Sequence, residues 1–345
     1  MSGSASRPVA GLAIAIALAL GAGGCATAAH TTSTRSTTVT RTSSAPATQT
    51  TVTSSTPTST LPGAGQPPVT IGDKNYTEQF VLGQLYLQAL RAQGFTVTIN
   101  QNIGPTDVTL QALETGALTM YPEYLNTFES AIAGYRHGFR SSIAADHAAE
   151  RYGLAHGLAL LEPTPFSDTD AIAVTVAFAH HNRLRSILDL RRVAATMTLA
   201  GPPQFQTSAP GLPALSAAYG VTPGAFRGLP VGAQYAQLNT GSVQAAYVNS
   251  TDGQLASGDY LVLSDNRRIF GWGNVVPVVS AAALAKEGPV FANTVERVDR
   301  ALTTPVMRRL NAAVDVAKQD PAAVATQFLE THGLLEPLGS VAPAP

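Results

Sequence analysis

The chain has 345 residues, of which 45% are hydrophobic and only 12% are charged, and its formal net charge at pH 7 is −1. A nearly neutral balance without a basic stripe argues against a nucleic-acid partner. Beyond the N-terminal segment no apolar run reaches the roughly 20 residues that a membrane-spanning helix needs, so we expect a soluble folded part.

Residues 1–24 have the layout of an export signal. Arg7 precedes an apolar run over residues 9–20, and small residues lead to Cys25, the only cysteine. This arrangement is typical of a bacterial lipoprotein, in which Cys25 would carry the lipid anchor on the outer face of the cytoplasmic membrane. Ala22 stands where leucine is usual, and cleavage by ordinary signal peptidase near residues 26–29 is the alternative.

Residues 25–68 are expected to form a disordered tether. Ser and Thr make up 22 of the 35 residues from 26 to 60, a composition that cannot bury enough apolar surface to offset chain entropy. Residues 339–345 are expected to be a disordered tail. The folded part therefore begins near residue 69 and ends near residue 338.

Alternating strands and helices follow in the folded part. We expect helices at 79–92 and 108–114 and strands at 69–71, 95–99 and 118–120, with Tyr121-Pro122 breaking the third strand. Further strands are expected at 171–178, 243–248, 260–263 and 275–279, and C-terminal helices at 290–316 and 321–332. Strands that alternate with helices indicate an α/β fold with a parallel sheet.

Two short motifs carry the functional information. Asp73-Lys74-Asn75-Tyr76-Thr77-Glu78-Gln79 follows the first strand, and Gly116-Ala-Leu-Thr-Met-Tyr-Pro-Glu-Tyr-Leu-Asn-Thr127 follows the second helix. Together they resemble the extracytoplasmic substrate-binding proteins of ABC importers for glycine betaine, choline and carnitine. That family reads G-x-K-x-F-T-E-Q and G-x-I-D-x-Y-P-E-Y-T-G-T in these places.

The resemblance implies a two-lobed fold like that of periplasmic binding proteins, with a ligand cleft between lobes joined by two crossing segments. Lobe 1 would comprise residues 69–173 and 277–338, and lobe 2 residues 174–276. The protein would capture an osmoprotectant-type solute by hinge closure and deliver it to a membrane permease with its ATPase. We expect a monomer with no cofactor and no metal ion.

Eight positions are candidate ligand contacts. A helix start after a strand can receive an anion, and an aromatic ring attracts a quaternary ammonium group. Matching to the family motifs, together with the neighbouring segments, gives Asn75, Thr77, Gln79, Tyr124, Thr127, Asp170, Asn249 and Trp272. For the segment at 75–79 a simple capped helix start is the alternative, and for Tyr124 plain packing between helices.

The rest of the family's aromatic cage does not match. Asp170, Asn249 and Gly273 stand where the relatives have tyrosines, and Tyr247 would compensate only if the strand register shifts. These replacements predict a more polar ligand than glycine betaine: a polyol, a hydroxylated aromatic compound or an amine with N–H groups. Alternatively, Asp170 only caps or salt-bridges the hinge.

Two other function classes remain open from the sequence. An enzyme is disfavoured, because the seven histidines show no metal-binding spacing and there is no G-x-S-x-G nucleophile motif. His180-His181 is expected in an exposed polar turn. A surface-anchored solute sensor that serves no importer fits the layout as well as a transport protein does.

Overall fold

The computed structural model of the protein describes residues 60–136 and 138–338. The expected export signal, Cys25, most of the expected tether and the tail at 339–345 lie outside these residues. No helix in the described ranges has the length and apolar character that a membrane crossing requires.

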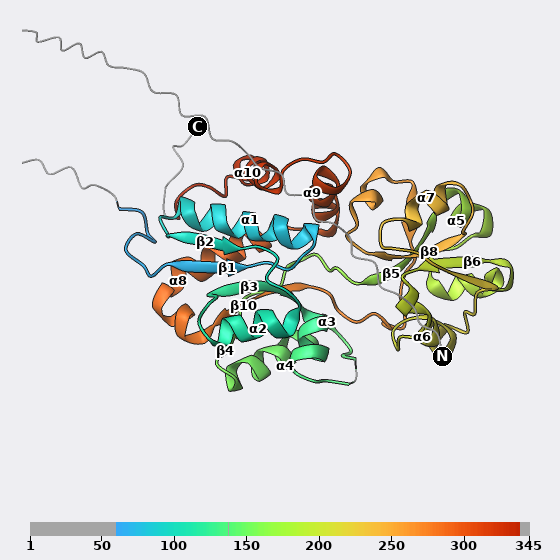
Figure 1. Cartoon of the computed structure of the whole chain (residues 1–345), viewed down its shortest axis with the longest axis horizontal. Coiled ribbons are helices and arrows are strands. Elements are labelled where there is room, and N and C mark those ends of the chain that lie inside the picture. The colour runs from blue at the N-terminus through green and yellow to red at the C-terminus, as the bar shows by residue number, and fades with distance from the viewer. Residues whose placement is uncertain (1–59, 137, 339–345) are drawn as a thin grey trace, which may run out of the picture. The chain divides into compact units, whose positions relative to one another are not determined.

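The first lobe is built on a five-stranded sheet of order β2-β1-β3-β10-β4 (Figure 1). Its strands are β1 Val69–Gly72, β2 Val97–Asn100, β3 Met120–Tyr124, β4 Leu158–Leu160 and β10 Val275–Ser280. β1 is parallel to β2 and β3, whereas β10 is antiparallel to both β3 and β4. The sheet is therefore mixed, with the returning strand β10 inserted near one edge.

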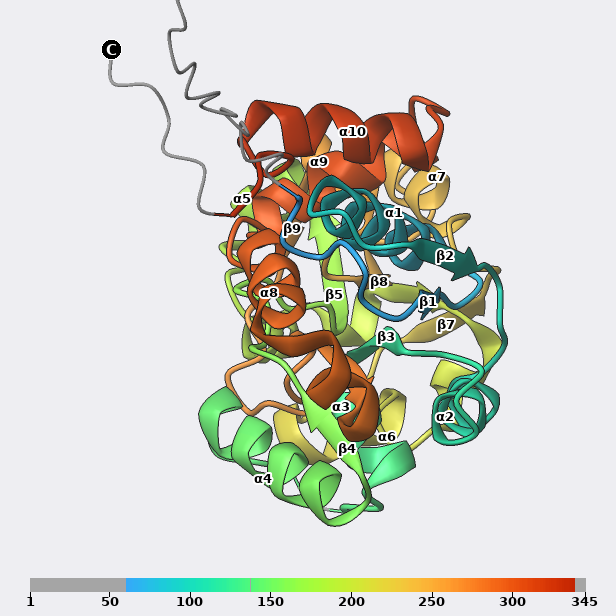
Figure 2. The same ribbon diagram turned by 90° about the vertical axis from the view of Figure 1, so that its left-hand side faces the viewer.

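Helices cover both faces of this sheet. One face carries α1 Thr77–Ala92, α8 Ala281–Asp299, α9 Thr304–Asp315 and α10 Pro321–Thr331, and the other carries α2 Thr106–Glu114, α3 Leu125–Thr127 and α4 Ser142–Ala155. Figure 2 shows α9 and α10 on one side of the strands and α4 on the other. The alternation along β10 follows this layering: Val275 and Val279 enter one core, and Val276 and Val278 enter the other.

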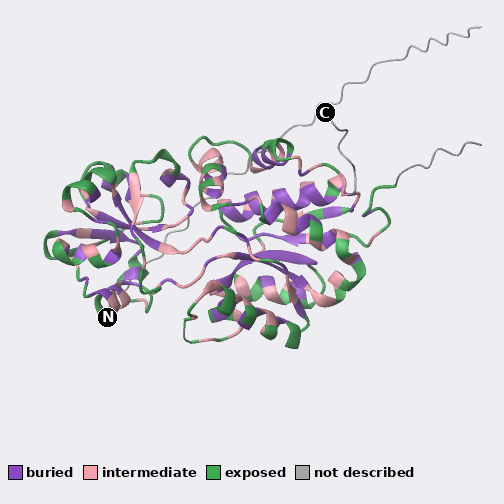
Figure 3. Cartoon of the chain, turned by 180° about the vertical axis from the view of Figure 1, so that it is seen from behind, coloured by how far each residue is buried: buried purple, intermediate pink, exposed green. Residues whose placement is uncertain are grey.

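The second lobe has its own sheet, of order β7-β6-β8-β5-β9. Its elements are β5 Asp170–Thr175, α5 Val176–Asn182, β6 Thr198–Gly201, α6 Leu212–Ala214, β7 Ala225–Gly228, α7 Gln234–Asn239, β8 Ala245–Asn249, the 3₁₀ helix η6 Gly253–Ser257 and β9 Tyr260–Val262. The inner strands β6, β8 and β5 are largely buried between two core clusters, whereas the edge strand β7 is mostly exposed and the edge strand β9 is half-buried (Figure 3). Short 3₁₀ and π turns complete the lobes at 128–132, 187–192, 194–196, 203–206 and 215–219.

The expected break of the third strand at Pro122 is wrong. β3 runs through it to Tyr124, and Pro122 lies opposite Pro277 of β10. The carbonyl of Pro122 accepts a hydrogen bond from Gln79, and that of Pro277 accepts one from Leu161. Because the polar edges of both prolines point away from each other, the missing N–H groups leave no gap in the ladder.

The strand predicted at the start of the second lobe ends earlier than expected. The strand expected over 171–178 stops at Thr175, whose Oγ1 accepts a hydrogen bond from the N–H of Phe178 and caps α5. His180 and His181 lie in the last turn of that helix and not in a loop.

The helix expected over 290–316 is divided, because α8 ends at Asp299 and α9 starts after the Thr303 cap. Helices α1 and α2 begin two residues before their predicted starts.

The lobes divide a few residues from the predicted boundaries. Asp170 already pairs with Asn249 in the second sheet, so the first lobe does not extend to residue 173. Val276, predicted in lobe 2, pairs with Glu123 in the first sheet. A run of β-branched residues indicates a strand, but it does not tell to which sheet that strand belongs. The crossing segments are thus 161–169 and 263–274.

The predicted tether also ends sooner than residue 68. Gly63 donates its N–H to the carbonyl of Gln93 at 2.7 Å, and its Cα lies against the ring of Phe95. Leu61 lies against Gly94. Residues 61–66 therefore form a turn that docks on the first lobe.

Candidate functional site

A cavity of about 390 Å³ lies between the two lobes, at the crossing segments. Four predicted contacts meet there: Tyr124 and Thr127 from the first lobe, and Asp170 and Asn249 from the second. Its remaining lining comes from Tyr76, Asn126, Asp168 and Thr169. The cavity thus joins the C-terminal end of β3, the start of α1 and the paired strands β5 and β8.

Two tyrosines supply the aromatic surface. The ring centroids of Tyr76 and Tyr124 are 6.0 Å apart, and the ring planes make an angle of 33°. Tyr124 is 7% exposed and donates its hydroxyl to Glu78 Oε1 at 2.9 Å, whereas Tyr76 is 40% exposed. Burial and the nearby Glu78 raise the pKa of Tyr124 well above its usual value, so the ring stays neutral and offers its face to a cation.

Asp170 and Asn249 lie on the opposite wall, and Tyr247, which does not line the cavity, is hydrogen-bonded to them. Asp170 and Asn249 are directly opposed in the β5–β8 pair, and the Tyr247 hydroxyl lies 2.6 Å from Asp170 Oδ1 and 3.1 Å from Asn249 Oδ1. Burial raises the pKa of Asp170, and the hydrogen bond from Tyr247 partly offsets this. The ring centroids of Tyr247 and Phe205 are 5.2 Å apart, and Tyr247 does not line the cavity, so it does not take the place of a cage tyrosine.

A second carboxylate, Asp168, lies on the crossing segment just before β5. Its Oδ1 accepts the N–H of Thr251 at 3.3 Å and the hydroxyl of Ser250 at 3.4 Å. Burial, reinforced by the charge of Glu78, raises the pKa of Asp168 well above its usual value. The cavity therefore combines two aromatic faces with two carboxylates that are poorly solvated, a combination suited to a cationic group.

Comparison with known proteins assigns this architecture. Residues 67–331 match the family described as the substrate binding domain of the ABC-type glycine betaine transport system. The chain belongs to this family. It is 32% identical over 279 residues to a glycine-betaine-binding protein of Pseudomonas aeruginosa. The aligned part is 77% of this chain and 88% of that protein.

A second relative is the glycine betaine-binding protein YehZ of Escherichia coli K12, 29% identical over 292 residues, with 79% of this chain and 93% of that protein covered. A solved structure, described as that of a glycine betaine/carnitine/choline ABC transporter, superposes with a TM-score of 0.73 at 23% identity. It covers 78% of this chain and all of that one, and at this identity the likeness concerns the fold.

These findings confirm the two-lobed α/β fold of a periplasmic binding protein. The protein is the substrate-binding component of an ABC transport system. Members of this family are solute-binding proteins and not enzymes, and they act outside the cytoplasm with a small-molecule ligand and a permease as partners.

The family motif could have revealed Tyr76. This tyrosine occupies the phenylalanine position of G-x-K-x-F-T-E-Q, and it lines the cavity beside Tyr124. Its predicted neighbours contribute less: Asn75 is exposed and is not among the lining residues, and Thr77 donates its hydroxyl to Asp315 at 2.5 Å and faces an adjoining cavity. An aromatic position inside a known motif was thus a better guide than the polar positions around it.

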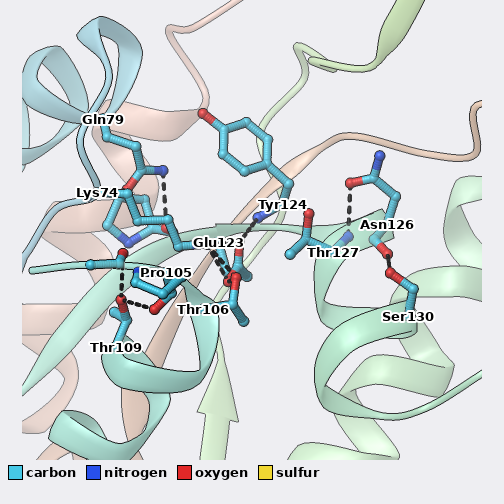
Figure 4. A network of polar contacts seen from close by, with 12 residues as sticks. Lys74, Gln79, Pro105, Thr106, Thr109, Glu123, Tyr124, Asn126, Thr127 and Ser130 are labelled. Atoms are coloured by element: carbon cyan, nitrogen blue, oxygen red, sulfur yellow. Dashed lines mark hydrogen bonds and ion pairs between the residues drawn. The ribbon is translucent and has the colours of Figure 1, made fainter. Parts of the chain in front are cut away.

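Gln79 supports the site from behind. It is fully buried; its Nε2 donates to the carbonyl of Pro122 at 3.1 Å, and its Oε1 accepts the N–H of Lys74 at 3.3 Å (Figure 4). In the same network the Lys74 ammonium lies 2.6 Å from both carboxylate oxygens of Glu123. Figure 4 shows the ring of Tyr124 pointing away from this ion pair, as alternation along β3 requires.

Trp272 is not part of the cavity lining. Its indole N–H donates to the carbonyl of Phe139 at 3.1 Å, and the Arg268 guanidinium lies 4.0 Å from its ring centroid. The next residue, Gly273, cannot hold the tyrosine of the relatives, because a side chain there would collide with the carbonyl of Asp168. The crossing segments pass too close together at this point for a third cage ring.

One group of possible metal ligands occurs in the described ranges, at Asp146, His147 and Glu150 of α4. Their ligand atoms lie within 4.8 Å of one another, but none of the three lines the interlobe cavity.

Proposed function

We propose that the protein binds an osmoprotectant-type amine of the glycine betaine, choline, carnitine or proline class in the interlobe cavity. The observation that carries the proposal is the pair of tyrosine rings, Tyr76 and Tyr124, set beside the Asp168 and Asp170 carboxylates. Each ring contributes roughly 0.5–2 kcal/mol of cation–π attraction, and the carboxylates add charge complementarity. The names of the two relatives, both glycine betaine-binding proteins, support this class.

The Asp170–Tyr247–Asn249 group favours a more polar member of this class, or a hydroxylated ligand. Asp170 and Asn249 present hydrogen-bonding atoms to the cavity, and Asp170 Oδ1 already accepts from the Tyr247 hydroxyl. A trimethylammonium group has no N–H to donate, whereas an amine with N–H groups or a hydroxylated solute can satisfy these acceptors. The protein should therefore bind an N–H amine or a hydroxylated amine more tightly than a trimethylammonium compound of the same charge.

Calorimetric titration of purified residues 60–345 tests both statements. The panel is glycine betaine, choline, carnitine and proline, set against a polyol and a hydroxylated amine. We expect Tyr124→Leu to weaken binding of a quaternary amine by roughly 3- to 30-fold, the equivalent of one ring. Asp259→Asn, an exposed acid that does not line the cavity, serves as the control. Unchanged affinity in Tyr124→Leu would contradict the proposal.

The delivery step is part of the same proposal. The crossing segments touch through the Ser167–Asn274 bridge, so the lobes can rotate about a short, paired hinge and close over the solute. Uptake of labelled solute by cells with and without the gene separates an importer subunit from a sensor. Loss of uptake supports delivery to a permease and ATPase, whereas unchanged uptake favours the sensor.

We also propose that Cys25 carries a lipid that holds the protein at the membrane, through the Ser/Thr-rich tether. The support is the small-residue sequence before this lone cysteine and the composition of residues 26–60. Cys25→Ala is expected to move the protein from the membrane fraction to the soluble fraction. Mass spectrometry of the N-terminal peptide would detect the acyl groups directly.

A further inference from the structure

A second cavity, of about 330 Å³, adjoins the first. The two share Tyr76, Asp168 and Asn249 as a common wall. The remaining lining of the second cavity comes from the start of α1, the loop before α7 and the first turn of α7, the start of η6 with the two residues before it, and the second half of α9 with the residues just after it. These residues are Thr77, Glu78, Val231, Gly232, Tyr235, Thr251, Asp252, Gln254, Asn311, Asp315 and Lys318. We call it the acidic cavity.

Four carboxylates line the acidic cavity: Glu78, Asp168, Asp252 and Asp315. None of them forms an ion pair with any residue of the described ranges. Neutral donors hold them instead: Tyr235 donates to Asp252 Oδ2 at 2.6 Å, and Thr77 donates to Asp315 Oδ1. Burial raises the pKa of Glu78 and Asp252, which shows how poorly this charge is compensated.

The basic groups nearby offset this charge only in part: the charge of Arg308 favours the ionised form of Asp252, but Arg308 forms no ion pair with any of the four carboxylates. Lys318 lies on the rim, is exposed and has no carboxylate partner in the structure as described. The Nε of Arg308 donates to the backbone carbonyl of Ser250 at 2.8 Å, so this guanidinium binds a neutral acceptor. The cavity as a whole therefore attracts cations.

Two kinds of acceptor in this cavity have no hydrogen-bond donor within the described residues. Oδ1 of Asp252 and Oδ2 of Asp315 accept no hydrogen bond from the described residues, and neither atom is sealed from solvent. Asn311 is 4% exposed and lines the cavity; its Nδ2 donates to Glu78 Oε2 and to the carbonyl of Thr251, but its Oδ1 has no donor in the described chain. A buried acceptor without a donor is unfavourable, and a ligand N–H group that reaches it would satisfy it.

We propose that the acidic cavity takes the second ammonium group of a linear diamine, whose first ammonium lies between Tyr76, Tyr124 and Asp168. The inference rests on the proposed function of the neighbouring cavity and names its ligand class. The shared wall lets one extended chain reach both cavities, and a primary ammonium has three N–H groups to distribute over the carboxylates. A single bare metal ion fits less well, because no three of these carboxylates bring their oxygens within 4.8 Å of one another.

Titration calorimetry with 1,4-diaminobutane, 1,5-diaminopentane, butylamine and choline tests this inference on the purified chain. We expect at least one diamine to bind ten times more tightly than butylamine, which has the same apolar chain but one ammonium. Asp315→Asn should weaken diamine binding about tenfold while changing choline and butylamine binding less than twofold. Asp259→Asn, at an exposed residue that lines neither cavity, should change none of them.

Asp252→Asn is a second variant for the same titration. Asp252 accepts hydrogen bonds from the Tyr235 hydroxyl and the Asn249 N–H, so the thermal midpoint of this variant is measured to confirm that it folds. Diamines that bind no more tightly than butylamine would overturn the inference, as would Asp315→Asn lowering choline and diamine affinity equally. If magnesium ions at millimolar concentration displace the diamine but not choline or butylamine, the acidic cavity is a metal site, and the inference is overturned as well. If choline binds and diamines do not, only this inference fails; if neither binds, the proposed function fails as well.

Discussion

The Lys74–Glu123 ion pair is the structural centre of the ligand-binding edge. Both side chains are buried, and Thr106 adds hydrogen bonds to each. Lys74 lies between the end of β1 and the start of α1, whereas Glu123 lies on β3 next to Tyr124. The pair therefore fixes the spacing between the segment that carries Tyr76 and the strand that carries Tyr124.

We expect Glu123→Gln to lower the free energy of unfolding by about 3–5 kcal/mol, because it leaves the Lys74 ammonium buried without a counter-charge. Urea denaturation measures the loss. Lys74→Met with Glu123→Leu is the matched comparison, and it should cost less than Glu123→Gln, since no charge is left unpaired. A single variant that loses less than the double one would contradict a structural ion pair.

At the residue scale the sequence predicted where the ligand cavity lies better than it predicted which residues line it. Tyr124, Thr127, Asp170 and Asn249 do line one cavity, and the motif match alone placed them. Trp272 failed because neighbouring residues on an extended crossing segment point in different directions, and the sequence does not say which one faces the cavity. Asp168 was missed because its role depends on the contact with Thr251, 83 residues away in the chain.

At the scale of elements, α9 of the first lobe packs directly on η6 of the second. Gly253 makes this possible: an added Cβ would lie 2.6 Å from the backbone nitrogen of Ala312 and 2.8 Å from the carbonyl carbon of Asn311. Arg308 and Asn311 donate across the same seam, to the carbonyls of Ser250 and Thr251. The seam forms one side of the acidic cavity, so its geometry sets the position of Asp252 relative to Asp315.

Gly253→Ala should therefore force η6 away from α9. Overpacking of this kind costs typically 1–3 kcal/mol, which we expect as a lower urea midpoint. Ala256→Val adds volume on the exposed side of the same short helix and should leave the midpoint nearly unchanged. Equal urea midpoints for the two variants would show that the contact between η6 and α9 can adjust to the added methyl group without loss of stability.

Element boundaries were predictable only where a local signal sets them. The starts of α1 and α2 came within two residues, because each follows a strand and a turn. The seam was not predictable, since nothing local to Gly253 or to α9 indicates that they touch. The same limit applies to Pro122, whose place in β3 depends on Pro277 in a distant strand.

For the whole molecule, the buried carboxylates predict a stability that falls as pH rises. Burial raises the pKa of Glu129 to about 7 and that of Asp73 to about 6. Between pH 4.5 and these values the unfolded chain has released the proton and the folded chain still holds it, so each unit of pH costs up to about 1.4 kcal/mol per group. Asp189, whose pKa is lowered to about 2 by backbone N–H groups, acts oppositely but only below about pH 4.

The ligand-free protein should accordingly be more stable at pH 5 than at pH 7.5, by urea denaturation at each pH. Glu129→Gln removes one of the titrating groups and should reduce this difference by at least about 1 kcal/mol. Glu330→Gln, exposed on α10, is the control and should leave the difference intact. Stability that instead rises from pH 5 to pH 7.5 would mean that these carboxylates ionise freely in the folded state, and the electrostatic description of the molecule would then be wrong. The same result would weaken the case for a cation-seeking acidic cavity, since both rest on carboxylates that the fold leaves poorly solvated and without ion-pair partners.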